Sequence, residues 1–564
     1  MPSKTVSSVK VDPGIPAGAR NRTSMADVDT ASAGEKWSEG WRALFLCALS
    51  GCLWFLACTP YNLWLLAWIA MIPALFVVDN AASTGRAGLF CWVAGGVTIA
   101  GGFFWIIELL RRFAGMPYPL ARLTFLLFCG YQGIPFLFFG LTVHFIRRRK
   151  RLPMSLLAPL VMVTFEWIIP RLFPSYLAIM LAGHPLTIQI ADLTGPLGVT
   201  ALLLMVNGAL YDLLTGHRTG IRSALAAMII LAASLLYGLV RMRHFDAASV
   251  AAQKLAVGVV QPNVAYNEKG VRHPEWARSQ LEDLQKQSRQ LERRGAQLIV
   301  WTEVSYPFTL TRDLREDFPE SDSRRMRRGF TTPTVVGALT QAPGVAFSYN
   351  SALLVDQSGS IAGRYDKMRL LAFGEHVPAG DTFPWLRELV PPGFGTFLPG
   401  KEAAPLPLAI PGVGTVRLGT AICYEDILPD FLREVGKYHP HLLVNLTNDT
   451  WFGEKVEPWE HLALAVFAAV EQRTGMVRAV NSGVSAFIDP TGRIVEKTYA
   501  VDPYIHPHPA SSALATLPLL DGGHTVFATL GNLFAYICAG CTAFLVVTCA
   551  APSLRHRGGR LPQS

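Results

Sequence analysis

Charged residues are scarce in this chain: they make up 16% of its 564 residues, whereas hydrophobic residues make up 51%. Soluble globular proteins usually carry about 25% charged residues, so this composition excludes an ordinary soluble protein. The first forty residues lack an apolar run, which excludes a cleaved signal peptide and predicts a disordered tail. No segment repeats at a fixed period along the chain.

Cysteine is almost absent from the polar part of the chain. Eight of the nine cysteines lie in long apolar runs, where cysteine acts as a small hydrophobic residue, and only Cys423 lies in a polar segment. Cys423 therefore has no neighbour there for a disulfide. A single cysteine in a polar domain is either an unreactive packing residue or a nucleophile. The residues around Cys423 distinguish these two roles.

The apolar residues are concentrated in eight segments, which we predict to be transmembrane helices. A bilayer requires about 20 mostly apolar residues per helix, and most of the segments meet that length. The segments are Trp41–Thr59, Leu63–Val78, Ala87–Leu110, Leu123–Ile146, Leu156–Ile169, Pro196–Leu214, Ala224–Val240 and Thr525–Ala550. The fifth is short and contains Glu166, which we expect to pair with Arg171.

Basic residues in the short loops predict the orientation of these helices, because cytoplasmic loops are enriched in Lys and Arg. The densest cluster, residues 147–151, is therefore placed in the cytoplasm, together with Arg218, Arg222 and the C-terminal tail. Arg111–Arg112 falls on the outer side and argues against the scheme, but the three inner clusters outweigh it. The net charge of +9 largely reflects this topology and calls for no nucleic-acid partner.

The predicted organisation has five parts. They are a disordered cytoplasmic tail (1–40), a seven-helix transmembrane domain (41–244), an extracytoplasmic domain (245–524), a C-terminal transmembrane helix (525–550) and a cytoplasmic tail (551–564). The extracytoplasmic part is long enough for one globular domain.

Strands alternate with helices in this polar domain. Leucines spaced over residues 281–291 mark one face of a helix, and turn sequences at 357–359 and 489–492 predict hairpins. The strands are expected at Lys254–Val260, Leu298–Trp301, Thr334–Leu339, Ser351–Asp356, Val416–Ile422 and His441–Leu446. This pattern predicts an α/β domain with helices packed on a sheet.

Three chemically active residues follow predicted strands, where active-site groups collect in α/β folds. Glu303 follows Leu298–Trp301, Lys367 comes after the first hairpin, and Cys423 follows Val416–Ile422. A thiolate nucleophile needs a neighbouring cation that keeps it charged, a base for its proton and a positive group near the developing oxyanion. Cysteine, glutamate and lysine supply these parts without a histidine.

The same region carries an ordered set of motifs. They are Gln261-Pro-Asn263, Trp301-Thr-Glu303, Tyr365-Asp-Lys367, Phe373-Gly-Glu375, Ile422-Cys-Tyr-Glu425 and Asn448-Asp-Thr-Trp-Phe-Gly453. In this order they resemble the carbon–nitrogen hydrolase (nitrilase) superfamily. With seven predicted helices before the motifs and one after them, the chain resembles the apolipoprotein N-acyltransferases of the bacterial inner membrane over about residues 40–550.

The resemblance implies a polytopic α-helical membrane protein whose extracytoplasmic domain is a nitrilase-like αββα sandwich. It implies a catalytic triad of Glu303, Lys367 and Cys423. Substrate-binding or supporting roles would fall to Glu375, Tyr424, Glu425, Asn448, Asp449 and Trp451. The sequence departs from the family at Thr302, usually proline, at Met368-Arg369, usually a basic residue followed by histidine, and at Gly270, often a tryptophan that contacts substrate.

The resemblance further implies an acyltransferase of lipoprotein biosynthesis. An acyl chain of a membrane phospholipid would pass through a thioester on Cys423 to the α-amine of the diacylglyceryl-cysteine at the N-terminus of an apolipoprotein. Moving each CH₂ of such a chain into water costs about 0.8 kcal/mol, so this chemistry belongs at a bilayer surface. We expect the bacterial inner membrane, a catalytic domain that faces the periplasm, a monomer, and no cofactor or metal.

Two other functions remain open at this point. A membrane-anchored amidase or nitrilase would use the same triad and pass the acyl group to water, although one helix would suffice to anchor it. A non-enzymatic transporter or scaffold would tolerate the replacement of Cys423. His376 and His461 would allow a Cys–His pair, but we expect both to be hydrogen-bonded helpers, and His506 and His508 lack a third zinc ligand.

Overall fold

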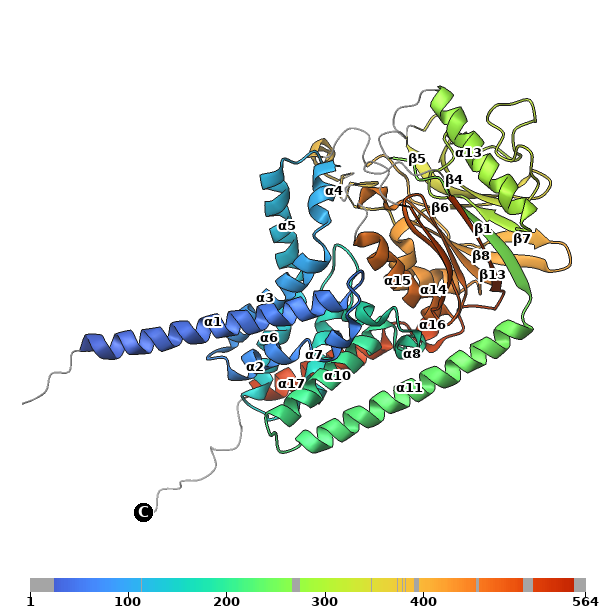
Figure 1. Cartoon of the computed structure of the whole chain (residues 1–564). Coiled ribbons are helices and arrows are strands. Elements are labelled where there is room, and N and C mark those ends of the chain that lie inside the picture. The colour runs from blue at the N-terminus through green and yellow to red at the C-terminus, as the bar shows by residue number, and fades with distance from the viewer. Residues whose placement is uncertain are drawn as a thin grey trace, which may run out of the picture. The chain divides into compact units, whose positions relative to one another are not determined.

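The structure, a computed structural model, describes most of the chain. The described residues are 25–112, 114–265, 274–345, 347–372, 374–377, 379–380, 382–389, 395–452, 456–500 and 511–551. The chain divides into two units, Met1–Phe45 and Leu46–Ser564. The first contributes the N-terminal part of helix α1 (Met25–Ala57), and the second holds all the other elements (Figure 1).

Between residues 25 and 251 the regular elements of the described chain are all helices, from blue to green in Figure 1. After α1 come η1 (Trp64–Trp68), α2 (Ile72–Asn80), α3 (Thr84–Gly102), α4 (Ile106–Arg112), α5 (Tyr118–Gln132), α6 (Ile134–Arg147), α7 (Met154–Ile168), η2 (Leu177–Leu181), α8 (Pro185–Ile188), α9 (Ala191–Thr194), α10 (Pro196–Leu214) and α11 (Gly220–Ala251). Two late helices, α16 (Val526–Leu530) and α17 (Leu533–Ala550), pack back on this set, since α17 contacts α6 and α7.

Five helices are long and apolar enough to cross a membrane, or six if a bent pair counts as one span. The five are Gly40–Ala57, Tyr118–Arg147, Pro196–Leu214, Gly220–Ala251 and Leu533–Ala550. The pair is α3 and α4, which meet at 59°. The chain is thus a membrane protein, while eight full spans stay a prediction.

The two remaining predicted spans correspond to shorter apolar helices, Trp64–Asn80 and Met154–Ile168. The second of these is bounded by Pro153 and Pro170, and proline disfavours helical backbone in the residue before it. Helix α1, in contrast, is longer than predicted. It begins at Met25 rather than near residue 41, because a helix that is already nucleated extends at little cost through good helix formers such as Ala and Glu.

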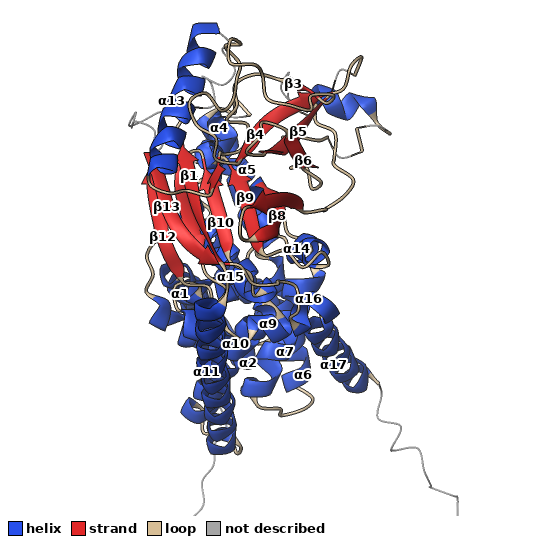
Figure 2. Ribbon diagram, turned by 90° about the vertical axis from the view of Figure 1, so that its right-hand side faces the viewer, coloured by secondary structure: helices blue, strands red, loops and turns tan. Residues whose placement is uncertain are grey.

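Two β-sheets pack face to face between residues 254 and 518, as the strands in Figure 2 show. The first sheet has the order β13-β1-β2-β4-β5-β6, with β3 paired to β4, and the second has the order β12-β11-β10-β9-β8-β7. The strands are β1 (Lys254–Gln261), β2 (Leu298–Val300), β3 (Leu310–Thr311), β4 (Thr334–Gln341), β5 (Ser348–Val355), β6 (Ile361–Asp366), β7 (Leu406–Ile410), β8 (Gly414–Ile422), β9 (Leu442–Thr447), β10 (Met476–Val480), β11 (Gly483–Ile488), β12 (Ile494–Ala500) and β13 (Ser511–Pro518). Contacts of β1 with β10, β5 with β8 and β6 with β7 join the sheets.

Helices cover the outer faces of both sheets. Helix α13 (Pro274–Arg293) packs on β1 and β13, and buries the predicted leucine face at Leu281, Leu284 and Leu291. On the second sheet, α14 (Pro429–Gly436) contacts β8 and α15 (Glu457–Gln472) contacts β11. The layers are therefore helix, sheet, sheet and helix, and the predicted αββα arrangement is found.

Helix α15 connects the sandwich to the helical part of the chain. It contacts η2, α9 and α16 as well as β11, and nearly all of its residues are buried. An α-helix that is buried on every side is unusual for a surface layer. Its polar residues Glu457, Glu460 and His461 therefore lie inside the protein rather than in solvent.

Candidate active site

Each of the three predicted catalytic residues follows the end of a strand. Glu303 comes shortly after β2, Lys367 directly after β6 and Cys423 directly after β8. Cys423 opens the short helix η4 (Cys423–Ile427) with a φ of 57°, and Val304, next to Glu303, has a φ of 47°. Non-glycine residues rarely occupy this left-handed region, which costs on the order of 1–3 kcal/mol and collects at functional sites.

Lys367 lies between two carboxylates. Its Nζ donates to Glu375 Oε1 at 2.8 Å and lies 3.4 Å from Glu303 Oε1. Asn350 on β5 donates through Nδ2 to the same carboxylates, at 2.7 Å to Glu303 and 3.3 Å to Glu375. Lys367 is 1% exposed and Asn350 is 2% exposed. Both carboxylates are thus held by the same two donors in a site that is largely buried.

The charges of this cluster act on the sulfur of Cys423, which is buried as well. Burial raises the pKa of the Cys423 thiol well above its usual value; Lys367 lowers it, and Glu303 and Glu375 raise it further. Burial lowers the pKa of Lys367, but negative charge on Cys423 and the two carboxylates raises it well above its usual value. These shifts favour an ammonium on Lys367 beside a protonated Cys423, because the two carboxylates that share this ammonium oppose its effect on the thiol.

Glu425 fastens the nucleophile turn to the segment after Lys367. Its Oε1 accepts hydrogen bonds from the backbone N–H groups of Met368 and Arg369, both at 2.8 Å. Its Oε2 accepts from the Tyr365 hydroxyl at 2.7 Å and from the N–H of Ile422 at 2.8 Å. Burial raises the pKa of Glu425 to about 7, and these hydrogen bonds oppose the increase. One buried carboxylate therefore ties two catalytic segments together.

Further contacts fix the residues beside the sulfur. The Tyr424 hydroxyl donates to the carbonyl of Leu370 at 3.0 Å, and the Tyr424 ring lies 5.6 Å from Lys367 Nζ. Asn445 on β9 donates through Nδ2 to the carbonyl of Cys423 at 2.8 Å. The nucleophile turn is thus held from both sheets.

Behind the nucleophile turn, four charged side chains form a closed set of ion pairs, which we name the buried ion ring: Asp426, His461, Asp449 and Arg478. His461 lies 2.9 Å from Asp426 through Nε2 and 3.2 Å from Asp449 through Nδ1. Arg478 contacts the other oxygen of each aspartate, at 3.2 Å and 3.3 Å. No member is more than 4% exposed. The ring joins η4, the turn after β9, α15 and β10.

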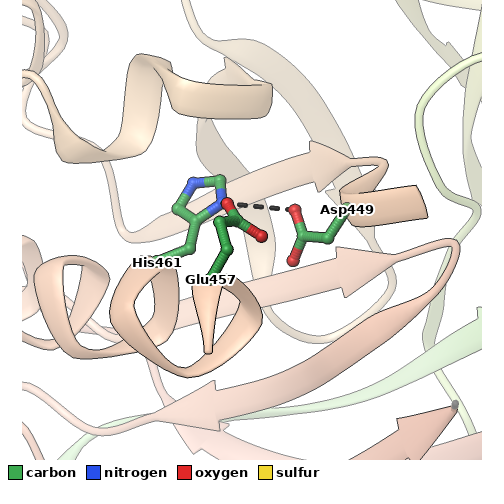
Figure 3. A group of neighbouring side chains, drawn as sticks. All are labelled: Asp449, Glu457 and His461. Atoms are coloured by element: carbon green, nitrogen blue, oxygen red, sulfur yellow. Dashed lines mark hydrogen bonds and ion pairs between the residues drawn. The ribbon is translucent and has the colours of Figure 1, made fainter. Parts of the chain in front are cut away.

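His461 is charged in this setting. Burial and Arg478 lower its pKa, but Asp426 and Asp449 raise it well above the usual value of histidine. A third carboxylate, Glu457 Oε1, lies 3.3 Å from Nδ1 (Figure 3). Because both ring nitrogens face carboxylates, His461 holds its neighbours as an imidazolium and is not available as a base for Cys423.

Asp449, Glu457 and His461 also have the spacing of a cation site. One ligand atom from each lies within 4.8 Å of the others. Arg478 and the His461 protons already supply positive charge to these carboxylates. Burial and the charge of Asp449 raise the pKa of Glu457 to about 7, so a proton on Glu457 can balance the remaining charge. That the protein needs no metal stays a prediction.

The other predicted residues are dispersed around this centre. Asn448 accepts from the Thr450 hydroxyl at 2.6 Å and from Asn481 Nδ2 at 2.8 Å, which shapes the turn after β9. The side chain of Trp451 lies outside the described residues, as do Gly270, His506 and His508. His376 lies on the wall of the chamber described next.

A chamber of about 1110 Å³ opens beside the nucleophile turn. One wall comes from the helical part of the chain, with α4, α5 and residues 171–174. The other comes from the sandwich, with residues 368–372, Tyr424 and Leu428. The walls are mostly apolar. The residue next to the nucleophile therefore borders a cavity large enough for an acyl chain, although the walls come from segments that are far apart in the sequence.

Sequence models of two protein families match this chain. The apolipoprotein N-acyltransferase N-terminal domain matches residues 50–209, and the carbon-nitrogen hydrolase family matches residues 256–500. An apolipoprotein N-acyltransferase of Rhodopseudomonas palustris is 30% identical over 547 residues, which cover 90% of this chain and 95% of that protein. The chain belongs to the apolipoprotein N-acyltransferase family.

Other proteins are also similar to this chain. An apolipoprotein N-acyltransferase of Geobacter metallireducens is 28% identical over 542 residues, with 92% of this chain and 97% of that protein covered. Among solved structures, an amidase of the nitrilase superfamily from Nesterenkonia is 15% identical, covers 50% of this chain and 96% of that chain, and has a TM-score of 0.35. The expectations of an acyltransferase, a nitrilase-like domain and a role in lipoprotein N-acylation are confirmed. A non-enzymatic transporter or scaffold is ruled out.

Several residues of the site were not predicted from the sequence. Asn350 contacts Glu303, Arg478 contacts Asp449, and Asp426 joins Arg478 to His461. None of Asn350, Asp426 and Arg478 belongs to the motifs that carry the family resemblance. Arg478 offered one signal, because an arginine inside a run of small apolar strand residues is almost never buried without a partner. Asn350 offered no such signal, because it lies in the polar first half of β5, Ser348-Tyr-Asn-Ser351.

A buried glutamate on α15 predicts a pH-dependent stability. Burial and the nearby Asp430 raise the pKa of Glu471 to about 8, whereas an unfolded chain has a glutamate pKa of about 4.3. The folded protein therefore binds the proton more tightly, and stability is lost as the pH rises through this window, by up to about 1.4 kcal/mol per pH unit. We expect the Glu471→Gln variant to show a flatter decline in thermal unfolding temperature between pH 5 and 8 than the wild type. Equal slopes in the two proteins would contradict this assignment.

Proposed function

We propose that Glu303, Lys367 and Cys423 transfer an acyl chain from a membrane phospholipid to the α-amine of a diacylglyceryl-cysteine, through a thioester on Cys423. The observation that carries the proposal is the chamber beside the nucleophile turn, which Tyr424 lines and whose apolar walls belong partly to the apolar helices and partly to the sandwich. A site for soluble amides needs no wall from a membrane-spanning part.

The first half-reaction begins at a neutral thiol. Glu303 takes the proton of Cys423 while the sulfur attacks the ester carbonyl of the donor. Lys367 and the backbone N–H of Tyr424 stabilise the oxyanion of the tetrahedral intermediate. When the intermediate collapses, the C–O bond breaks and the leaving alkoxide receives the proton from Glu303. The products are a lysophospholipid and an acyl thioester. Glu375 supports this step as a second partner of Lys367.

The second half-reaction releases the acyl chain to nitrogen. The acceptor presents an α-ammonium, which gives one proton to water and a second to Glu303 as the nitrogen attacks the thioester carbonyl. The C–S bond breaks, and the thiolate of Cys423 takes the proton from Glu303. An amide and the resting thiol result. An amide is more stable than a thioester, so this step runs downhill.

The proposal also includes the membrane location, the orientation and the oligomeric state of the protein. We place the protein in the bacterial inner membrane as a monomer, with the sandwich in the periplasm and no cofactor. The basic residues at 147–151 support a cytoplasmic position for the opposite end of the helices. Asn448, Asp449 and Trp451 are proposed to shape the acceptor side of the pocket, with Tyr424 and Glu425 beside the thioester.

The test is the capture of the covalent intermediate on the purified full-length protein. Incubation with a phospholipid labelled in its acyl chain is expected to give an adduct that hydroxylamine removes, because hydroxylamine cleaves thioesters. Cys423→Ala should carry none, whereas Cys541→Ala, which removes an exposed cysteine of α17, should carry the same amount as the wild type. An adduct that survives Cys423→Ala would refute the proposal.

Addition of a diacylated lipopeptide separates transfer from hydrolysis. Transfer predicts that the label moves from the protein to the amine of the lipopeptide at the rate at which the adduct decays. Hydrolysis, the reaction of an amidase, predicts free fatty acid and no labelled lipopeptide. An N-acetylated lipopeptide is the matched control, since it lacks the reactive amine and should leave the adduct intact.

A further inference from the structure

The wall of the chamber carries a histidine that the proposed reaction does not use. His376 lines the chamber together with Tyr424, the residue that follows the nucleophile. The side chain is partly exposed, and its imidazole makes no hydrogen bond to any other residue that the structure describes. The hydrogen-bonded role expected for this histidine is therefore not found among these residues, and its ring nitrogens can bind a molecule in the chamber.

Backbone contacts hold His376 beside the catalytic segments. The residue before it, Glu375, accepts the hydrogen bond of the catalytic lysine at 2.8 Å. The N–H groups of Glu375 and His376 donate to the carbonyl of Leu371 at 2.9 Å and 3.2 Å. The carbonyl of Leu370 accepts from the Tyr424 hydroxyl at 3.0 Å. The turn that carries His376 is thus fastened both to the partner of the lysine and to the neighbour of the nucleophile.

Among the residues described, the chamber wall holds no other base that works near neutral pH. The other lining residues with titratable side chains are Arg171, Arg369, Tyr131 and Tyr424. Both arginines are already paired with carboxylates, Arg171 with Glu166 at 3.5 Å, as expected from the sequence, and Arg369 with Glu434 at 2.9 Å. Arginine keeps its proton and tyrosine stays neutral at this pH, whereas histidine ordinarily exchanges a proton between about pH 5 and 8. An ammonium group in the chamber therefore meets one wall residue that can accept a proton.

We propose that His376 is the base that takes the first proton from the α-ammonium of the acceptor in the second half-reaction. The inference rests on the proposed function. The ammonium gives this proton to the neutral imidazole, and the resulting amine attacks the thioester carbonyl. The second proton passes through Glu303 to the thiolate of Cys423 as the C–S bond breaks. The imidazolium then gives its proton to water, so the positive charge that enters as an ammonium leaves as a hydrated proton.

The test follows the two half-reactions separately on the purified full-length protein in detergent micelles. The acyl-enzyme is formed with a labelled phospholipid, a diacylated lipopeptide is added, and the transfer of the label is timed across about pH 5 to 9. For His376→Gln we expect the transfer rate at neutral pH to fall about a hundredfold, since a general base typically contributes that much. The burst of p-nitrophenol from p-nitrophenyl palmitate, which reports the first half-reaction, should keep the wild-type rate.

The pH dependence identifies the group that takes the proton. In the wild type the transfer rate should rise as the imidazole becomes neutral. In His376→Gln it should rise only at the higher pH at which the acceptor loses its own proton, near the ordinary α-amino pKa of about 8. The two proteins should therefore transfer at similar rates at high pH. Imidazole added to His376→Ala should restore transfer at neutral pH, because it replaces the missing base.

Two comparisons make the result specific. Hydroxylamine is largely unprotonated at neutral pH and needs no base for a first proton, so it should remove the acyl chain from the wild type and from His376→Gln at the same rate. His244→Gln replaces an exposed histidine of α11 that does not line the chamber, and it should behave as wild type in both half-reactions.

Three outcomes would overturn the inference. Transfer by His376→Gln at the wild-type rate across the whole pH range would mean that His376 takes no proton. Equal losses in the two half-reactions would mean that it acts on Cys423 or on the shape of the site. A loss that persists at high pH and that imidazole does not restore would mean that it positions the acceptor. The proposed function fails by a different result, the absence of any adduct on wild-type Cys423 with every phospholipid donor.

Discussion

Lys367→Met is expected to lower the rate of acyl-enzyme formation by about a thousandfold, because the positive charge that stabilises the oxyanion is lost. The variant also leaves Glu303 and Glu375 facing each other without the ammonium that lies between them. Loss of one partner from a buried ion pair typically costs about 3–5 kcal/mol. The measurement is the burst of leaving group from p-nitrophenyl palmitate, together with thermal unfolding of the same preparation.

Two variants separate the loss of catalysis from the loss of stability. Lys367→Arg keeps a positive charge between the carboxylates but moves it from the oxyanion position, so we expect a folded protein that is still nearly inactive. Lys437→Met removes an exposed lysine after α14 and should change neither property. An active Lys367→Met protein would show that the ammonium takes no part in the reaction.

The positions of the three proposed catalytic residues could be predicted because the information is local. Glu303, Lys367 and Cys423 each follow the end of a strand, and functional side chains of α/β folds collect at that edge of a sheet. The strands themselves follow from runs of β-branched and aliphatic residues between turn signals. Most predicted strands were found within a few residues of their expected bounds, whereas β3, β7, β10 and β13 were missed.

The contacts that hold the site could not be predicted, because they join segments that are distant in the sequence. Asp426, Asp449, His461 and Arg478 come from four different elements, and only the packing of η4, α15 and β10 brings them together. The protonation state of Cys423 depends in the same way on Glu303 and Glu375, which lie in other segments. A single sequence does not contain the distances between charged side chains that determine the strength of these ion pairs and the pKa of the thiol.

The membrane part shows the same limit. Apolar helices occur at all eight predicted segments and five of them are long enough to cross a membrane, but apolar length could not show that the third segment bends by 59° between α3 and α4. Helix α4, which follows the bend, lines the chamber. Arg171 and Arg369 line that chamber. The sequence predicted Arg171 only as the ion-pair partner of Glu166, and Arg369 only as a position that differs from the family pattern.

Arg478→Met is expected to give the largest loss of stability among substitutions away from the sulfur. Arg478 is fully buried and contacts both aspartates of the buried ion ring. Its removal leaves two buried carboxylates with one shared cation, His461, at a cost of about 3–5 kcal/mol. For a domain of this size we expect the thermal midpoint to fall by roughly 10 °C. Thermal unfolding in detergent, followed by circular dichroism, measures the change.

The comparison with Arg493→Met tests whether burial is the cause. Arg493 pairs with Asp246 on the surface, where both side chains are 40% or more exposed, and this pair should contribute only about 0–1 kcal/mol. Adding Asp426→Asn to Arg478→Met should recover part of the stability, because one uncompensated charge is removed, and the double-mutant cycle gives the coupling energy. If the double variant is no more stable than Arg478→Met, the loss comes from the packing of the arginine side chain and the ring does not hold the nucleophile turn through its charges.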